Sequence, residues 1–228
     1  MFTVLPNGGL CNKLRVLLSY YEFAKKQEKI LHIKWVVSKY CNGNFLDYFE
    51  TIPEIQFINN LSSDNIIKYR GCYIRPNFKP NYEYLVLLNH MKEKIQNKIN
   101  ILGNNYIAIH IRRTDHITLQ KNKGVYRSHT DEKFIDWIDK NKNNVNLYVA
   151  TDNQETYNTF KEKYPQIIKF NYHTKENKDD FRETSLENAI IDLYMCVYAK
   201  NFKGTCKSSF TETILEIKKK KTWIPTFL

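Results

Sequence analysis

Apolar and polar residues follow two different periods along the chain, and these periods predict strands and helices in turn. Residues 2–5 predict a short strand, and residues 6–9, which include two glycines, predict a turn. Residues 10–29 predict a helix, because their apolar positions recur every three or four residues. Residues 31–37 predict a second strand. The chain therefore opens with a strand, a turn, a helix and a strand.

The segment that follows has a weaker pattern. Residues 45–49 and 55–58 are short apolar runs with turn signals between them, and we expect this stretch to be irregular. Residues 82–99 predict a helix, and the Asn-rich residues 100–105 look like a link between domains. The expected domains are residues 1–100 and 101–228.

Beyond this link, short apolar runs alternate regularly with helical patterns. Strands are expected at residues 106–111, 147–150, 167–170 and 202–205. Helices are expected at residues 131–141, 154–164, 185–199 and 209–219. This alternation predicts an α/β fold with right-handed βαβ units and a buried parallel sheet. In such sheets, ligands bind beyond the carboxyl ends of the strands.

The composition is that of a globular protein. The 228 residues are 42% hydrophobic, which is enough for a core without metals or disulfides. No stretch approaches about 18 consecutive apolar residues, and the start lacks a basic region before an apolar one, so we expect neither a membrane span nor a signal peptide. The five cysteines contain no C-x-x-C pair, which favours free thiols in the cytoplasm over disulfides or a zinc site.

The chain is basic, with 35 Lys and Arg against 24 Asp and Glu and a formal charge of +11. This charge and the 16 tyrosines would suit a nucleic-acid-binding protein. Against that alternative, the lysines are scattered and no basic-aromatic motif stands out. The lysine run at residues 218–221 closes a predicted helix, where cations stabilise the dipole. We therefore expect no nucleic-acid partner.

The densest cluster of charged residues follows the predicted strand at residues 106–111. This strand contains His110 and leads directly into Arg112, Arg113 and Asp115. Strand alternation places His110 and Arg112 on one face and Arg113 on the other. Because arginine binds phosphate with a planar fork that lysine lacks, two arginines at a strand end favour an anionic ligand. The alternative is an exposed strand end whose arginines form surface ion pairs.

Other predicted strand ends add polar groups. Asp152 follows the next strand, although an Asp in this position also commonly caps the helix after it. Ser208 and Ser209 open a helix, whose free N–H groups and dipole can bind an anion, or whose serine can simply act as the cap. Gly8 and Gly9 would let the backbone approach a diphosphate closely, although a Gly pair also makes an ordinary turn.

Several motifs are missing from the sequence. It contains no D-x-D, no Walker A sequence, no G-x-G-x-x-G and no His or Cys cluster with metal-ligand spacing. A D-x-D pair would hold a divalent ion on the diphosphate of a nucleotide sugar. Without it, arginine and helix N-termini would have to neutralise the diphosphate. The sequence therefore offers no recognisable motif for a metal or a cofactor.

Five segments together resemble the fucosyltransferase superfamily, which contains the α-1,6-fucosyltransferases, the nodulation fucosyltransferases and the protein O-fucosyltransferases. These segments are Gly8–Asn12, His110–Asp115, Ala150–Asp152, Arg182–Asp192 and Gly204–Phe210. The resemblance implies a GT-B fold of two small Rossmann-like lobes, with the donor in the cleft and the acceptor on the N-terminal lobe. It also implies metal-independent, inverting transfer of L-fucose from GDP-fucose to a glycan hydroxyl. Use of another nucleotide sugar, or an inactive nucleotide-sugar binder, are the alternatives.

The resemblance implies a role for each motif residue. Arg112 would bind the β-phosphate of the donor, and His110 and Asp192 would contact guanosine. Gly9 and Asn12 would approach the diphosphate from the first lobe. The rest of the donor pocket would be formed by Asp152, Ser208, Ser209 and the N–H of Phe210.

Departure of the diphosphate builds negative charge, which Arg112 would stabilise as it develops. Arg113 is also expected at the donor site, where it would orient the surrounding loop by pairing with a carboxylate. Asp115 and His116 are the candidates for the base that takes the acceptor proton. The α-1,6 enzymes have a Lys after Thr-Asp and a Glu shortly after it, whereas this chain has His116 and Gln120.

Overall fold

The computed structural model forms two compact units, which divide between Met91 and Lys92. The structure describes residues 2–60, 66–67, 78–113, 130–167 and 184–220. The division lies inside α2 (Asn89–Leu102), on the N-terminal side of the boundary at residue 100 that the sequence favours. Most of α2 therefore belongs to the second unit, and its Lys94 pairs with Glu187 of that unit at 2.8 Å.

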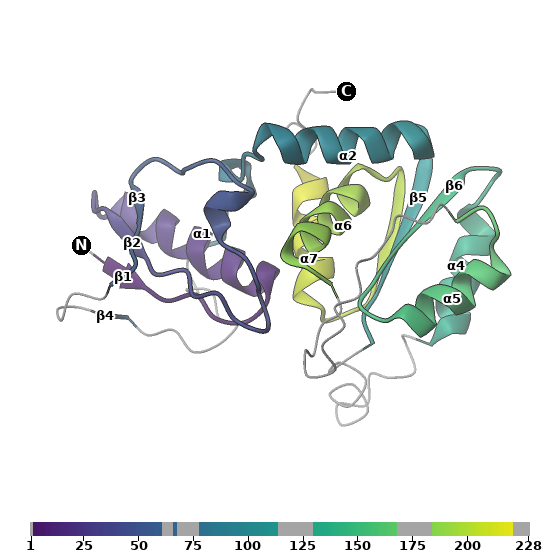
Figure 1. Cartoon of the computed structure of the whole chain (residues 1–228), viewed down its shortest axis with the longest axis horizontal. Coiled ribbons are helices and arrows are strands. Elements are labelled where there is room, and N and C mark those ends of the chain that lie inside the picture. Colours follow the sequence, from purple (N-terminus) through teal and green to yellow (C-terminus); the bar gives the residue numbers. More distant parts are fainter. Residues whose placement is uncertain (1, 61–65, 68–77, 114–129, 168–183, 221–228) are drawn as a thin grey trace. The chain divides into compact units, whose positions relative to one another are not determined.

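The first unit is built on a parallel sheet with the strand order β3-β2-β1-β4 (Figure 1). Its strands are β1 (Phe2–Val4), β2 (Leu31–Ile33), β3 (Ile55–Phe57) and β4 (Ile66–Ile67). Helix α1 (Leu10–Lys26) connects β1 to β2. Leu14, Leu17 and Leu18 of this helix are fully buried, as its helical period predicts.

Two expectations for the first sheet are wrong. Residues 55–58 are not irregular, because Ile55 and Phe57 pair with β2 and form the edge strand β3. The second strand ends at Ile33 and does not continue to Val37. Ile33 lies opposite Val4 and Phe57, where both neighbouring strands also end. Beyond it, the Lys34 N–H still donates to the Val4 carbonyl at 3.0 Å, but no further strand residue remains to continue the ladder.

The expected helix at residues 82–99 is also wrong at its start. A single 3-10 turn, η2 (Tyr82–Tyr84), comes first, and α2 begins only at Asn89. Between them, Leu87 forms an antiparallel bridge with Phe49, and the Glu50 N–H donates to the Val86 carbonyl at 2.8 Å. This pairing holds the backbone extended. A second 3-10 turn, η1 (Phe45–Asp47), precedes Phe49.

The second unit contains a parallel sheet with the order β6-β5-β7. Its strands are β5 (Tyr106–Ile111), β6 (Asn146–Thr151) and β7 (Asn201–Gly204). Its remaining helices are α4 (Asp131–Asn141), α5 (Gln154–Lys163), α6 (Leu186–Tyr198) and α7 (Ser209–Lys219). Of the strand expected at residues 167–170, Ile167 bridges to Leu147 and the other three residues lie outside the described residues.

The central strand β5 is buried along its whole length, and its two faces meet different helices. Ile107, Ile109 and Ile111 pack into one core with α4 and α5. On the opposite face, the Tyr106 hydroxyl donates to the Met195 carbonyl of α6 at 2.6 Å, and His110 contacts α7. Figure 1 shows the two helix pairs on opposite sides of the sheet. The alternation expected from the sequence is confirmed.

Within the described ranges, no helix is long and apolar enough to cross a membrane.

Candidate active site

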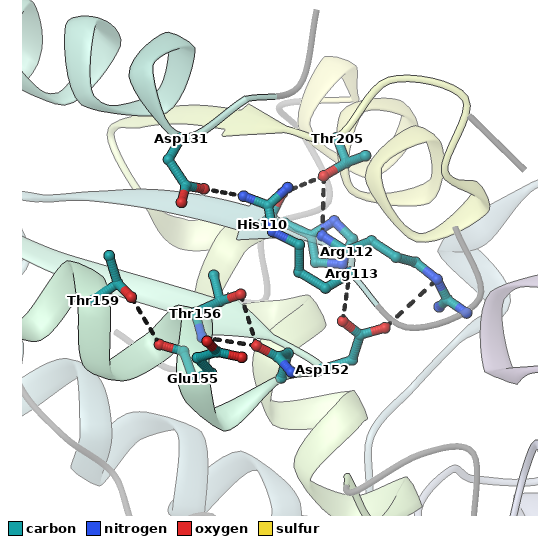
Figure 2. A network of polar contacts seen from close by, with 10 residues as sticks. His110, Arg112, Arg113, Asp131, Asp152, Glu155, Thr156, Thr159 and Thr205 are labelled. Atoms are coloured by element: carbon teal, nitrogen blue, oxygen red, sulfur yellow. Dashed lines mark hydrogen bonds and ion pairs between the residues drawn. The ribbon is translucent and has the colours of Figure 1, made fainter. Parts of the chain in front are cut away.

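The carboxyl ends of the three strands in the second unit meet at one edge, and hydrogen bonds join them there (Figure 2). The Arg112 N–H donates to the Thr205 hydroxyl at 3.0 Å, and the Thr205 N–H donates to the His110 carbonyl at 2.9 Å. On the other side of β5, the Arg113 N–H donates to the Asp152 carboxylate at 2.8 Å. Residues that follow three different strands are thus fixed in one small region.

Arg112 and Arg113 send their guanidinium groups in opposite directions (Figure 2). Arg113 pairs with Asp131, the first residue of α4, so Asp131 is the carboxylate that we expected beside it. Arg112 Nε lies 3.7 Å from Asp152 Oδ2. That distance is too long for a hydrogen bond, so Asp152 orients the Arg112 guanidinium by charge attraction. Only 15% of the Arg112 side chain is exposed to solvent, which strengthens this attraction.

His110 is held by helix α7. Its Nδ1 lies 2.9 Å from the Thr211 hydroxyl, and its ring stacks on Phe210 with centroids 4.6 Å apart. Gly204 allows this approach, because a Cβ there would lie 2.4 Å from the Thr211 hydroxyl oxygen. The glycine at the end of β7 therefore lets α7 come close enough to orient His110.

The N-terminus of α7 has no side-chain cap. Ser208 occupies the N-cap position, but its hydroxyl makes no capping hydrogen bond. The Ser208 side chain therefore does not cap the helix, which was the alternative to an anion site. Ser209 and Phe210 are the first helical residues, and the N–H groups of a first helical turn point out of the helix. Together with the helix dipole, these groups could bind an anion on the same face of the sheet as His110.

Asp192 lies deeper on that same face. Its carboxylate is 5% exposed and accepts a hydrogen bond from the Tyr148 hydroxyl at 2.5 Å. Tyr148 pairs in register with Ala108, one same-face position before His110 along β5. Asp192 also acts on Lys98 of α2: burial lowers the pKa of Lys98, and the Asp192 charge partly offsets this shift. Tyr148 therefore orients the Asp192 carboxylate, and the charge of Asp192 acts on Lys98.

The first unit has an open helix start of its own. Gly8 has φ of +93°, a region that favours glycine, and Gly9 occupies the N-cap position of α1, where it has no side chain to cap the helix. The first turn of α1 contains no acidic residue. Asn12 Oδ1 is buried, and among the described residues it has no hydrogen-bond partner. This turn could therefore bind an anion, with the Asn12 amide beside it.

Some candidate residues have no described position. Asp115, His116, Gln120 and Arg182 lie outside the described residues. In the part of the chain that the structure does describe, no three His, Cys, Asp or Glu side chains are grouped as a metal site would need.

Comparison with known proteins identifies the family. The profile of the GDP-fucose protein O-fucosyltransferase family matches residues 26–219, which is most of the chain. The protein belongs to this family. It is therefore a glycosyltransferase of the fucosyltransferase superfamily, as the motifs predicted. A search of curated protein sequences finds no match.

Solved fucosyltransferase structures share the fold. The fucosyltransferase NodZ from Bradyrhizobium is 15% identical, with a TM-score of 0.61 over 93% of this chain and 91% of that one. A structure of POFUT1 in complex with GDP is 12% identical, with a TM-score of 0.64 over 95% of this chain and 93% of that one. A NodZ α-1,6-fucosyltransferase crystal soaked with GDP-fucose gives 14% identity and a TM-score of 0.60, over 93% and 91% of the two chains. The family member described here thus has the GT-B-like α/β fold expected from its sequence.

Four residues of this fucosyltransferase-family site were not found from the sequence. Thr205 lies within the Gly204–Phe210 motif and Thr211 directly follows it, so their closeness to this motif was the signal that could have found them. Tyr148 and Asp131 gave no such signal, because each acts on a residue about 20 to 45 positions away through contacts that only the fold creates.

Proposed function

We propose that the protein is a metal-independent, inverting fucosyltransferase that uses GDP-fucose as donor and a glycan hydroxyl as acceptor. Arg112 carries the proposal, because Asp152 orients its guanidinium at the strand edge. Strand alternation would put Arg112 on the same face as His110, which α7 contacts. Membership of the family and the relatives crystallised with GDP or GDP-fucose support this donor.

In the proposed reaction, the acceptor oxygen forms a bond to the anomeric carbon as the bond from that carbon to the β-phosphate oxygen breaks. Attack from the face opposite the diphosphate inverts the configuration. The leaving GDP gains negative charge, which Arg112 and the N–H groups of Ser209 and Phe210 would stabilise as it develops. The acceptor proton would pass to Asp115 or His116.

Guanine recognition is assigned to Asp192. Its carboxylate could accept hydrogen bonds from both N1–H and N2–H of guanine, a pattern that uracil does not offer. The Tyr148 hydroxyl already binds Oδ1 at 2.5 Å and so would hold the carboxylate in one orientation. His110, stacked on Phe210, would contact the nucleoside from the same face.

Ligand-dependent melting tests the donor assignment. We expect GDP to stabilise the protein by about 2.7 kcal/mol at 100 times its Kd, and EDTA to leave this shift unchanged. UDP should give a much smaller shift, because it lacks the N1–H and N2–H donors that Asp192 would bind. Differential scanning fluorimetry measures both shifts. Equal shifts with GDP and UDP would disprove the guanine assignment, and loss of the GDP shift in EDTA would disprove metal independence.

Replacing Tyr148 tests how Asp192 is oriented. Tyr148→Phe should raise the Kd for GDP roughly tenfold, since a hydrogen bond to a charged group contributes about 1.5 kcal/mol or more. The Kd for UDP should not change. The control is Tyr106→Phe, which removes another buried hydroxyl on this face, one that binds the Met195 carbonyl. Titration calorimetry on both variants distinguishes the cases: similar losses in both would show a general packing effect.

We propose a cytoplasmic location as well. The support is that, among the described residues, Cys11, Cys41, Cys196 and Cys206 are thiols that form no disulfide.

A further inference from the structure

A pocket of about 310 Å³ lies in the first unit, at the carboxyl ends of two of its strands. Trp35 follows β2 by two residues, and Phe57 is the last residue of β3. The Ile58 N–H donates to the Ile33 carbonyl at 2.9 Å, so the two strand ends stay together. This is the edge at which open parallel sheets bind ligands. The volume is at the lower limit for small-molecule sites, so it suits one ring better than a nucleotide.

One wall of the pocket is aromatic and fixed in place. The Trp35 indole N–H donates to the Gly43 carbonyl at 3.0 Å, and Lys13 Nζ lies 4.7 Å from the centre of its ring. Phe45 is buried and stacks on Phe57 with centroids 5.0 Å apart. These contacts hold the aromatic surfaces in place before any ligand arrives, which reduces the cost of binding.

The rim of the pocket is polar. Asp47 Oδ2 accepts hydrogen bonds from the backbone and side-chain nitrogens of Asn44, at 3.2 and 3.3 Å. Among the described residues, the other oxygen of this carboxylate has no partner. Asn59 adds a second amide at the rim. Carboxylates accept hydrogen bonds, and amides both accept and donate them, so this rim is suited to a group of hydroxyls.

The charge of the pocket excludes an anionic ligand. Among the described residues, its lining contains the carboxylate of Asp47 and no Lys or Arg. Lys13, which lies over the Trp35 ring, is 1% exposed and binds the Val36 carbonyl, so its charge is not available at the pocket surface. A phosphate or diphosphate would be repelled by Asp47, so this pocket does not suit the donor diphosphate.

We propose that this pocket binds one neutral sugar ring of the acceptor glycan. A pyranose ring has a C–H face that packs on an aromatic wall and hydroxyls around its edge that meet a polar rim. The size, the fixed aromatic surface and the uncompensated carboxylate all fit such a ring. That this sugar belongs to the acceptor glycan rests on the proposed function.

The test is saturation-transfer NMR on the full chain with methyl glycosides as probes, namely neutral hexosides, deoxyhexosides and N-acetylhexosaminides. At least one should bind saturably, and hexose phosphates should bind more weakly. Trp35→Ala should weaken that glycoside roughly tenfold or more, which corresponds to about 1.4 kcal/mol or more, because it removes the large apolar surface on which the ring would pack. Asp47→Asn, which keeps the shape of the rim, should weaken it by a similar factor. Val37→Ser, an exposed apolar residue outside the lining, is the matched control and should leave binding unchanged.

Two results would overturn the proposal: no saturable binding of any glycoside, or binding that both Trp35→Ala and Asp47→Asn leave unchanged. The GDP-dependent melting shift of each variant separates this proposal from the donor assignment. Loss of glycoside binding with an intact GDP shift supports the pocket. If GDP does not bind the wild type, the transferase proposal fails. Glycoside binding that depends on Trp35 would still show that the pocket is a sugar site.

Discussion

Arg112→Lys is expected to reduce sugar transfer by roughly 30-fold to 1,000-fold while the protein stays folded. This range corresponds to losing about 2 to 4 kcal/mol of transition-state stabilisation, as when one preorganised donor is removed. Lysine keeps the charge but loses the planar fork that grips two phosphate oxygens. Turnover of GDP-fucose, measured by the GDP released at saturating donor, reports the effect directly.

Arg113→Lys is the matched control for this substitution. Arg113 points away from Arg112 and pairs with Asp131, so its replacement should change stability more than turnover. If Arg112→Lys retained near wild-type turnover and Arg113→Lys were inactive, the assignment of faces would be reversed. If both variants were fully active, the diphosphate would be bound elsewhere and the proposed mechanism would fail.

Gly204→Ala is expected to destabilise the protein by about 1 to 3 kcal/mol, the usual cost of overpacking a core. The new Cβ would lie 2.4 and 2.5 Å from two side-chain atoms of Thr211, and 2.9 Å from Phe202 Cζ. Thr211 is 5% exposed and β-branched, so its side chain has little freedom to move away. Thermal unfolding should show a Tm lower by roughly 2 to 4 °C for each kcal/mol lost.

A double-mutant cycle with Thr211→Ala tests the cause of this loss. Once both close atoms of Thr211 are gone, Gly204→Ala should cost less than about 1 kcal/mol, because the far end of Phe202 can give way. Weaker GDP binding should accompany Gly204→Ala, since Thr211 also positions His110. Additive losses in the double variant would instead place the strain in the backbone of β7.

The sequence predicted the parts of the donor-side site that follow directly from single strands and from the order of strands and helices. The run Tyr106–Ile111 is apolar and ends in charged residues, so strand alternation alone assigned Arg112 and Arg113 to different sides. The alternation of strands and helices predicted that Asp152 and the Ser208–Phe210 segment lie near the same sheet edge. The first inference uses local geometry, which the backbone imposes wherever a strand forms. The second uses the rule that the carboxyl ends of parallel strands lie at one edge of a sheet.

Only the tertiary structure decided where short segments pair. Residues 55–57 form a strand because β2 supplies their hydrogen-bond partners, and residues 85–88 stay extended because the segment at residues 48–50 pairs with them. A three-residue strand cannot satisfy its backbone by itself, so its own pattern does not predict it.

The sequence by itself determined the family, the α/β class and the strand ends that carry the chemistry, because each is encoded in a continuous run of residues. The tertiary structure alone determined which partners orient those residues: Asp131 for Arg113, Tyr148 for Asp192, and Thr211 for His110. These partners lie 18, 44 and 101 positions away in the sequence. Contacts over such separations arise only when the sheet and its covering helices are assembled, since no local period links the residues concerned.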